Sequence, residues 1–479
     1  MESPRTLSEK VFATLLKRGM YASSGMLISR VAASLAGIII ARGVGPSMFG
    51  VYATVLALIE FSASFTEIGL TTGLKREGSR SPALLPQILG NVITVQFIMG
   101  LVAIGIAFAA LPLVSRNPLA MSVFPPLALM EISVIFAGPF LAVLQVRGEQ
   151  RLASLFVGGR GLIFLGGIVT LASFRFDVVT LAWYHGISYF VISLLIALSV
   201  MLRVSVRFRL TNLREQLKGA LPFGLSSALN SGLGQLPVLF LSHFATEESV
   251  GNFAVALRFV TICILVGGVA NAEAFLPALF GLFRTDRSRF RQVCSWMQRL
   301  YIPGGILVSS ALYVCSEALV VIVQGCEYRE AIGMLRILCW SVTLTYGRIA
   351  ADAALTAGDR MKVKLMLQAY AMGVLLLVSL LLISQGGATG ASYAKLIGDL
   401  ALLALMTTYA YLKKLYSFLG LPGISVPTLI TLLLAILFTH SMPGHYFLAP
   451  ILFAASSLVL WYLPLRRRFV NQTLMRSNP

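Results

Sequence analysis

The sequence predicts an all-α polytopic membrane protein with about fourteen transmembrane helices, forming two six-helix lobes around a central cavity plus two C-terminal helices. Three observations support this prediction. The 479 residues are 57% hydrophobic and only 12% charged, with a mean hydropathy of +0.85, whereas soluble domains are about a quarter charged. Apolar runs of about 20 residues, the length that crosses a bilayer, recur along the chain. Basic residues separate these runs in an alternating pattern.

Charges, Gly and Pro interrupt the apolar sequence and delimit the expected spans. The expected N-terminal lobe, residues 1–202, contains Tyr21–Ala41, Phe49–Gly73, Pro86–Val114, Met121–Val146, Ser154–Phe174 and Val178–Leu202. Residues 203–218 form a basic cytoplasmic linker, which is either an amphipathic segment on anionic lipid or a plain loop. The expected C-terminal lobe, residues 219–411, contains Gly219–His243, Val250–Phe280, Ser295–Val323, Ala331–Ala357, Val363–Ser384 and Ala388–Tyr411. Residues 412–479 contain two further spans, Leu421–His440 and Tyr446–Pro464, and a cytoplasmic tail.

The distribution of Lys and Arg predicts the orientation, because these residues accumulate on cytoplasmic loops. With the N-terminus inside, the outer loops contain only Arg42, Arg116, Arg175 and Arg329, and the inner segments hold most of the 38 Lys and Arg residues. Omission of any one span would reverse this asymmetry downstream. We therefore expect both termini in the cytoplasm. Since the basic residues are scattered in small groups, no nucleic acid partner is expected.

The sequence gives no sign of a catalytic or metal centre. The five cysteines lack CxxC spacing and the four histidines form no metal-ligand pattern. No expected outer loop exceeds about a dozen residues, which leaves no room for an extramembrane catalytic domain. The chain is therefore not expected to be an enzyme.

A weak internal repeat relates the two lobes. FGVYA at residues 49–53 opens the second span, and VGNFA at residues 250–254 opens the eighth. Similarly, Gly148-Glu149-Gln150 follows the fourth span, and Gly358-Asp359-Arg360 follows the tenth. Because both lobes begin inside and contain an even number of spans, we expect an axis along the membrane normal to relate them.

Charged residues within the spans are the candidate functional groups, since a charge at the bilayer centre costs at least about 2.5 kcal/mol. Arg30 and Arg258 lack a helical partner, and guanidinium groups suit phosphate oxygens, so these two arginines are the leading anion-binding candidates. Glu60 and Glu67 lie two turns apart on one stripe and are candidates for ion coupling. A structural ion pair between Arg30 and Glu60 is the alternative interpretation.

Other polar residues predict the walls of the cavity and local neutralisation. The expected cavity-lining residues are Ser23, Ser34, Glu60, Ser64, Glu67, Asn230, Ser231 and Gln235. The seventh span also contains Pro222 and Pro237, which predicts a bent helix beside a cavity. Arg348 with Asp352, and Lys395 with Asp399, are each four residues apart and are expected to form structural ion pairs.

Several segments resemble the polysaccharide and O-antigen repeat-unit flippases. SRVAASLAGIIIARGVGPSMFGVYATVLALIEFSASFTEIGL is similar to the opening of that family, with its AR-x-LGP-x-x-FG-x-Y turn. ALPFGLSSALN, SVGNFAVALRF and EYREAIGMLRILCWSVTLTYGRIAADAALTAGDRMKVKL resemble later regions in the same order, so that the similarity extends to about Tyr411. Val44 replaces the usual Leu, and SQGGATGASYAK lacks the usual Pro of its turn.

This resemblance implies membership of the multidrug, oligosaccharidyl-lipid and polysaccharide exporter superfamily and alternating access in the bacterial cytoplasmic (inner) membrane. The implied substrate is an undecaprenyl-diphosphate-linked oligosaccharide repeat unit, moved to the periplasmic leaflet for exopolysaccharide, capsule or O-antigen synthesis. Arg30 and Arg258 would hold its diphosphate. Expected partners are this lipid-linked oligosaccharide, membrane lipids, and the polymerase and other export-pathway proteins. No cofactor is expected, apart from coupling to a proton or sodium gradient through Glu60 or Glu67.

Three alternatives to this function remain. A multidrug exporter of the same superfamily would keep the fold and change the cargo. A flippase for another lipid-linked cargo, such as a peptidoglycan precursor, would keep the chemistry of the headgroup. A polytopic polysaccharide polymerase or ligase would also be highly apolar, but it needs a sizeable outer loop to position an acceptor.

Overall fold

The computed structural model of the chain describes residues 4–66, 69–174, 176–207, 213–271 and 275–415. These residues form helices and short connections. The helices in order are α1 (Pro4–Ala63), α2 (Leu70–Arg80), η1 (Pro82–Leu84), α3 (Leu85–Val114), α4 (Leu119–Val146), α5 (Gln150–Ala172), α6 (Val178–Met201), α7 (Leu213–Phe244), α8 (Glu247–Ala270), α9 (Leu276–Thr285), α10 (Arg287–Ala318), η3 (Leu319–Gln324), η4 (Cys326–Tyr328), α11 (Ala331–Leu338), α12 (Trp340–Ala357) and α13 (Met361–Leu412).

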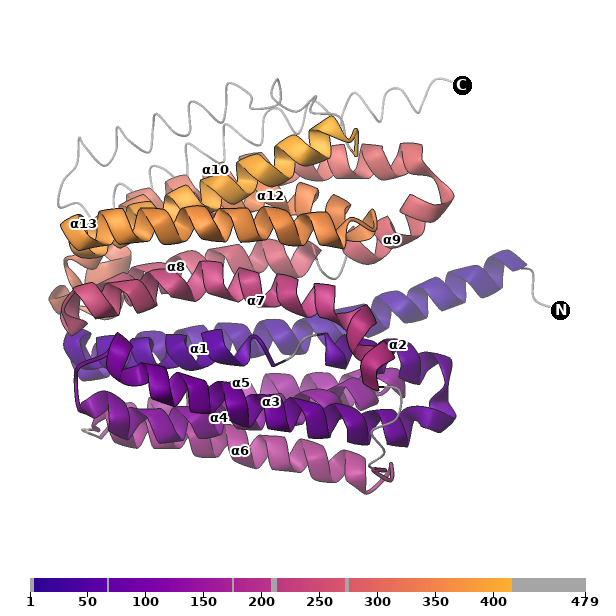
Figure 1. The fold of residues 1–479 in the computed structure, drawn as a ribbon, viewed down its shortest axis with the longest axis horizontal. Coiled ribbons are helices and arrows are strands. Elements are labelled where there is room, and N and C mark those ends of the chain that lie inside the picture. Colours follow the sequence, from indigo (N-terminus) through magenta and orange to yellow (C-terminus); the bar gives the residue numbers. More distant parts are fainter. Residues whose placement is uncertain (1–3, 67–68, 175, 208–212, 272–274, 416–479) are drawn as a thin grey trace.

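Two glycines reverse the chain inside long helices. Gly45 in α1 has φ 78° and ψ 168°, and Gly387 in α13 has φ 53° and ψ −130°. Positive φ is accessible to glycine without the steric penalty of a side chain. Each of these helices therefore contains two of the expected spans, folded back on each other (Figure 1). Following the predicted orientation, we call the end of the molecule that carries Gly45 and Gly387 the outer end and the opposite one the inner end.

The helices form two lobes, which confirms the predicted all-α architecture. In Figure 1, α2 to α6 lie on one side of the molecule and α7 to α13 on the other. Helix α1 packs against α5 within its own lobe, and it also packs against α7 and α8 of the second lobe. The first helix is thus the main element between the lobes.

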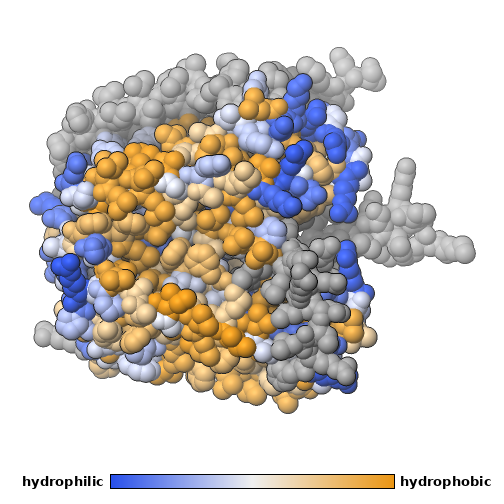
Figure 2. All heavy atoms as spheres, viewed as in Figure 1, coloured by the Kyte–Doolittle hydropathy of each residue, from blue (hydrophilic) through white to orange (hydrophobic). Residues whose placement is uncertain are grey.

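The surface is that of a protein in lipid. Figure 2 shows apolar residues over the middle of the visible face and hydrophilic residues gathered at its two ends. Large apolar side chains are widely exposed, among them Leu155 at 70% and Leu377 at 65%. In the described part of the chain, eight helices are long and apolar enough to cross a membrane. The chain is a multi-pass membrane protein.

The structure corrects several expected boundaries. The second expected span ends at Ala63 rather than Gly73, because Gly69 has φ 69° and starts the separate polar helix α2. The eighth expected span is divided, since α8 ends at Ala270 and α9 begins at Leu276. The tenth is likewise divided between α11 and α12. The last two expected spans lie outside the described residues, so the count of fourteen stays a prediction.

The two lobes meet directly at the outer end through the repeated segments. A Cβ atom on Gly50 would overlap the backbone of Glu247, and a Cβ atom on Gly251 would overlap the backbone of Pro46. Gly50 and Gly251 are equivalent in the repeat, and so are Pro46 and Glu247. This reciprocal contact between equivalent residues is what a two-fold relation between the lobes produces. Glycine at both positions lets the backbones of α1 and α8 approach closely.

Hydrogen bonds also join the two lobes at the outer end. The Arg42 guanidinium donates to the carbonyl oxygens of Ile322 and Val323 at 3.1 and 3.2 Å. The Tyr328 hydroxyl donates to the carbonyl oxygen of Ala41 at 2.6 Å. Helix α1 is therefore joined to the second lobe by side chains from both lobes.

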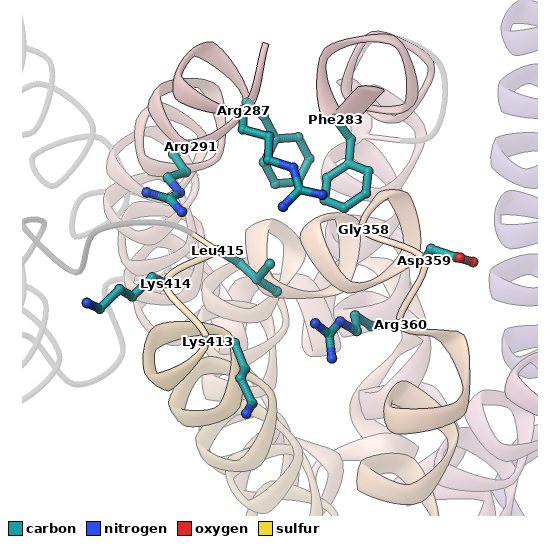
Figure 3. Close-up of a pocket in the computed structure, with 10 residues that line it drawn as sticks. Phe283, Arg287, Arg291, Gly358, Asp359, Arg360, Lys413, Lys414 and Leu415 are labelled. Atoms are coloured by element: carbon teal, nitrogen blue, oxygen red, sulfur yellow. The ribbon is translucent and has the colours of Figure 1, made fainter. Parts of the chain in front are cut away.

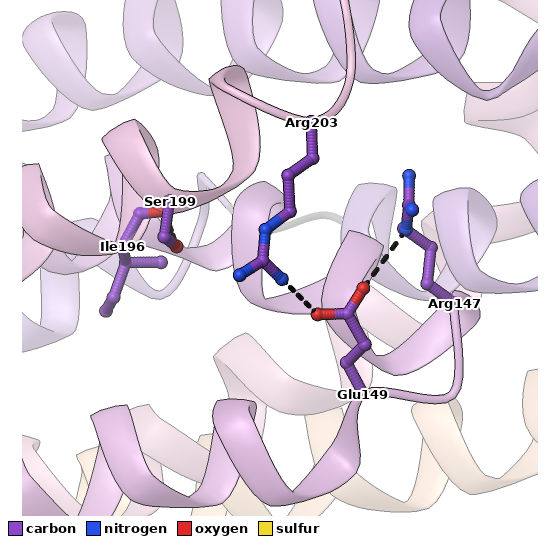
Figure 4. A network of polar contacts seen from close by, with 5 residues as sticks. All are labelled: Arg147, Glu149, Ile196, Ser199 and Arg203. Atoms are coloured by element: carbon purple, nitrogen blue, oxygen red, sulfur yellow. Dashed lines mark hydrogen bonds and ion pairs between the residues drawn. The ribbon is translucent and has the colours of Figure 1, made fainter.

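An ion-pair network fastens the inner end of the first lobe (Figure 4). The Glu149 carboxylate, in the turn between α4 and α5, contacts Arg203 Nη1 at 2.6 Å and Arg147 Nε at 3.2 Å. Arg203 belongs to the linker expected at residues 203–218. In that linker, residues 208–212 lie outside the described part, and α7 already begins at Leu213. The linker is therefore partly the first turns of α7.

Candidate functional site

Three adjoining cavities lie between and within the lobes, and Glu60 of α1 lines all three. The interface cavity, about 570 Å³, is walled by α1, α7 and α8. The first-lobe cavity, about 510 Å³, extends from α1 toward α2, α4 and α5, and α7 closes one side of it. The aromatic cavity, about 270 Å³, lies among α1, α4, α5, α6 and α8. Together they form a polar space inside an apolar protein.

Arg258 extends from α8 of the second lobe toward the first lobe and lines both the interface cavity and the aromatic cavity. Its guanidinium group occupies the space that a Cβ atom on Gly37 would need. The ring of Phe49 lies 5.6 Å from the guanidinium carbon, a distance that permits a cation–π interaction. The small residue on α1 and the aromatic ring therefore fix this charge at the boundary between the lobes.

Arg30 of α1 also lines the interface cavity, and it lines the first-lobe cavity as well. Its side chain is exposed. One turn further along, Ser34 lines the interface cavity, and its hydroxyl donates to the Arg30 carbonyl oxygen at 2.8 Å. The structure thus places Arg30 and Arg258, from different lobes, around one cavity.

Glu60 connects the lobes through a hydrogen bond. Gln235 Nε2 of α7 donates to its carboxylate at 2.6 Å. This contact gives the Glu60 carboxylate an amide partner, whereas the sequence suggested Arg30 as its ion-pair partner. Ser64 and Ser231 both line the first-lobe cavity. The second and seventh expected spans therefore contribute polar groups to the same space.

A cluster of aromatic residues forms the wall of the aromatic cavity, and sequence analysis did not identify it. The Tyr52 hydroxyl and His185 Nδ1 are hydrogen-bonded at 2.7 Å, and the His185 ring stacks on Phe164 with centroids 4.1 Å apart. Arg160 lies over the ring of Tyr189 at 4.7 Å. These residues come from three helices, α1, α5 and α6, and no regularity within one helix indicates their contact.

Further charged groups face the first-lobe cavity. Lys75 of α2, Glu131 of α4 and Arg160 of α5 line it together with Arg30 and Glu60. Glu131 could have been found from the sequence, because it is a lone carboxylate within the expected fourth span. Lys75 could not, since it was assigned to an inner loop.

Three expected cavity residues are not placed in these cavities. Asn230 is exposed on α7 and does not line any of the three. Glu67 lies outside the described residues, and the side chain of Ser23 does too. The expectations for Ser23 and Glu67 therefore remain predictions.

The two expected local ion pairs differ in outcome. Lys395 Nζ and the Asp399 carboxylate are 2.6 Å apart and buried within α13, as the spacing of four residues predicts. The expected pair between Arg348 and Asp352 does not form. Instead, the Asp352 carboxylate lies 2.8 Å from Lys364 Nζ of α13. Lys364 is on another helix, so spacing within α12 could not reveal it. The Arg348–Asp352 expectation is corrected in favour of this inter-helix pair.

The fold is similar to those of known membrane transporters. A structure of the lipid II flippase MurJ in an inward closed conformation matches with a TM-score of 0.76 at 13% identity, covering 94% of this chain and 100% of that chain. An inward-facing multidrug resistance MATE family transporter of the MOP superfamily matches with a TM-score of 0.67 at 16% identity, covering 82% and 98%. An outward-facing MATE family transporter matches with a TM-score of 0.60 at 18% identity, covering 84% and 95%. At these identities the similarity establishes the fold.

Comparison of sequences gives the family. No curated protein matches the chain. A family model described as polysaccharide biosynthesis protein matches residues 39–333, which is more than half of the chain and includes Glu60, Gln235 and Arg258 of the interface cavity. The chain therefore belongs to this family of polysaccharide biosynthesis proteins.

Proposed function

We propose that the protein is a flippase that carries an undecaprenyl-diphosphate-linked oligosaccharide from the cytoplasmic to the periplasmic leaflet of the bacterial inner membrane, without catalysing a reaction. The family match supports a role in polysaccharide biosynthesis. The transporter-like fold supports movement of a substrate across the membrane. The cavity between the lobes supplies the binding site, and alternating access supplies the route.

The observation that carries this proposal is the position of Arg30 and Arg258. They come from different lobes and line one cavity of about 570 Å³. Within the described residues, neither makes an ion pair within 4.0 Å of a carboxylate. A charge held in a membrane protein without an ion pair requires hydration or a ligand. A diphosphate provides oxygen acceptors that suit the guanidinium forks of both side chains.

The charge balance of the cavities also favours an anionic substrate. Among the described residues, the charged side chains that line the three cavities are Arg30, Lys75, Arg160, Arg258, Glu60 and Glu131. Cations outnumber carboxylates in this set. A multidrug exporter for cationic compounds would require the opposite balance. Hydroxyl and amide groups such as those of Ser34, Ser231 and Gln235 are suited to hydrogen bonds with sugars.

Alternating access requires contacts that form in one state and break in another. The glycine contact at the outer end and the hydrogen bond between Glu60 and Gln235 join the two lobes in the state described here. Opening of the cavity toward the periplasm would break the glycine contact. Glu60 lies at the junction of all three cavities, so we propose it as the residue that couples a proton or sodium gradient to this movement.

The experiment that tests the proposal replaces each arginine by glutamine in cells that make the polysaccharide. A hydrogen bond to a charged group contributes about 1.5 to 3 kcal/mol, so Arg30→Gln and Arg258→Gln are each expected to reduce export by about tenfold or more. Surface polysaccharide is measured together with the lipid-linked intermediate, which should accumulate in the cytoplasmic leaflet. Arg116→Gln, an exposed arginine near the outer end, is the matched control.

Immunoblotting of membrane fractions establishes that each variant is inserted at the normal level. Normal export by both cavity variants would show that these arginines do not bind the substrate. An equal loss in the Arg116→Gln control would show that net charge, rather than the cavity site, is responsible.

A further inference from the structure

A second basic hollow lies at the inner end of the second lobe, apart from the cavities between the lobes (Figure 3). Its volume is about 340 Å³. The side chains of Arg287, Arg291, Arg360, Lys413 and Lys414 line it. They come from three places in the chain: the start of α10, the turn between α12 and α13, and the end of α13. We call this hollow the basic pocket.

Aromatic rings form one wall of the basic pocket and hold one of its charges. Phe283 and Phe290 meet edge to face with centroids 5.2 Å apart. The Arg287 guanidinium carbon lies 5.0 Å from the Phe283 ring centroid, within the range of a cation–π interaction. On another wall, Arg360 Nη1 lies 3.5 Å from the Tyr409 hydroxyl. These contacts position the guanidinium groups before any ligand binds.

The positive charges of the basic pocket are not neutralised within it. Asp359 is the one acidic side chain among the described residues that line the pocket, and its carboxylate points away from Arg287 and Arg360 (Figure 3). Among the described residues, none of the five basic side chains forms an ion pair within 4.0 Å. The pocket therefore holds an excess of positive charge in a confined space.

The first lobe shows that this arrangement is not a general result of basic inner loops. By the repeat that relates Gly148-Glu149-Gln150 to Gly358-Asp359-Arg360, Asp359 is equivalent to Glu149, and the same offset relates Lys413 to Arg203. In the first lobe, Glu149 pairs with Arg203 at 2.6 Å (Figure 4). In the described part of the second lobe, the equivalent residues Asp359 and Lys413 form no ion pair, and both line the basic pocket.

A difference in backbone conformation accompanies the missing pair. In the first lobe, the residue with positive φ is Gly148, at 80°, immediately before the acidic residue. In the second lobe it is Asp359 itself, at 57°. The side chain of Asp359 consequently leaves the turn in a different direction from that of Glu149. Aspartate is among the few L-residues that adopt this left-handed conformation with some frequency, so the residue at position 359 is compatible with the turn that directs its carboxylate away from the pocket.

The surroundings of the pocket point to a lipid rather than to a soluble anion. Tyr411 and Leu412, next to Lys413, are 53% and 68% exposed. Trp296 on α10 is 55% exposed and lines a neighbouring hollow that shares Arg287 and Arg291 with the basic pocket. Exposed aromatic and apolar residues beside basic ones are typical of the interface between headgroups and acyl chains.

We propose that the basic pocket binds the phosphate groups of an anionic phospholipid of the inner leaflet. The guanidinium groups of Arg287 and Arg360 contact the phosphate oxygens, and Lys413 adds a point charge. The acyl chains lie along the exposed apolar surface at Tyr411 and Leu412. This site is independent of the substrate cavity and would tie the inner end of the second lobe to the membrane surface.

Native mass spectrometry of the full-length protein in neutral detergent tests this site. The probes are diphosphatidylglycerol, which carries two phosphates, zwitterionic phosphatidylethanolamine, and inorganic pyrophosphate alone. The pocket variant is Arg287→Gln with Arg360→Gln. The control is Arg289→Gln with Lys362→Gln, which removes the same charge from exposed positions at the starts of the same two helices, α10 and α13.

We expect tighter binding of diphosphatidylglycerol than of phosphatidylethanolamine. At about fivefold for each basic residue that contacts the lipid phosphates, the pocket variant should lose about 25-fold in affinity for diphosphatidylglycerol. The control should lose far less, because Arg289 and Lys362 do not line the pocket. Equal losses in pocket and control variants would show a diffuse positive surface and overturn the proposal. Binding of pyrophosphate without preference for diphosphatidylglycerol would overturn the assignment to a lipid. Thermal unfolding without lipid checks that both variants are folded.

Discussion

The glycine contact at the outer end predicts how the conformational equilibrium of the protein can be shifted. Alanine at position 50 or 251 adds a single methyl group, yet the atoms it would overlap are backbone atoms of Glu247 and Pro46. Backbone atoms in a helix cannot move aside as a flexible side chain can. The overlap exists only while α1 and α8 are in contact, so Gly50→Ala and Gly251→Ala destabilise the closed outer end selectively.

The magnitude follows from the cost of overpacking, about 1 to 3 kcal/mol for a well-packed contact. The intrinsic helix preference of alanine applies equally to open and closed states and cancels. A change of 1 to 3 kcal/mol corresponds to a shift of about 5- to 150-fold in the equilibrium between the two states. Because the two contacts belong to one helix crossing, a slight separation relieves both. The double variant should therefore shift the equilibrium by less than the sum of the single effects.

Distances between spin labels at Arg116→Cys and Glu330→Cys measure this equilibrium, since both residues are exposed near the outer end, one in each lobe. The five native cysteines are replaced first. Gly105→Ala is the matched control, because a Cβ atom on that helical glycine meets nothing within 4 Å. An unchanged distance distribution in both Gly50→Ala and Gly251→Ala would refute the interpretation of this crossing as a closure. Very different effects of the two substitutions would argue against the two-fold relation.

Three further predictions concern single charged residues. Asp399→Asn leaves the buried Lys395 charge without its partner and should cost about 3 to 5 kcal/mol, whereas Lys395→Met with Asp399→Leu should be better tolerated; thermal unfolding in detergent compares them. Hydrogen bonding by Thr180 holds the pKa of Asp177, the N-cap of α6, below its ordinary value. The stabilisation of the fold by the Asp177 carboxylate is therefore lost as pH falls through this lowered pKa. Asp177→Ala should abolish that pH dependence of unfolding and lower the stability by about 1 kcal/mol. Glu60→Gln should uncouple transport in proteoliposomes from an imposed proton or sodium gradient, and unaltered gradient dependence would remove Glu60 from this role.

The membrane architecture could be predicted from the sequence because the bilayer imposes a length and a polarity on each helix. Each of the first twelve expected spans overlaps a helix or half of a folded-back helix in the described residues. The boundaries were less predictable. The sequence predicts the turn at Gly45 as a short outer loop. It does not separate α2 from the second span, because the polar helix Leu70–Arg80 directly follows an apolar run.

The candidate site could be predicted where charge alone identified a residue. Arg30, Glu60 and Arg258 stand out in apolar spans, and the structure brings them to the interface cavity. Partners on other helices could not be predicted in this way. Spacing along one helix suggested Arg348 for Asp352, yet Lys364 of α13 is its partner. Such a contact depends on how helices pack, and this sequence alone carries no direct signal of that packing.

The two lobes are similar in fold but differ in how they use charge, and this difference bears on function. In the described part of the second lobe, three pairs of charged residues form inside or near the bundle, Lys395 with Asp399, Lys364 with Asp352, and Arg336 with Glu317, while Arg348 forms no ion pair. The first lobe instead directs Arg30, Lys75, Arg160, Glu60 and Glu131 into its cavity. Among the described residues of the second lobe, Arg258 is the charged residue that lines the interface cavity. An anionic headgroup would therefore be held mainly by the first lobe, and its contact with Arg258 would link substrate binding to movement of the second lobe. Loss of Arg258 should then affect the movement between states more strongly than the initial binding, whereas loss of Arg30 should weaken binding itself.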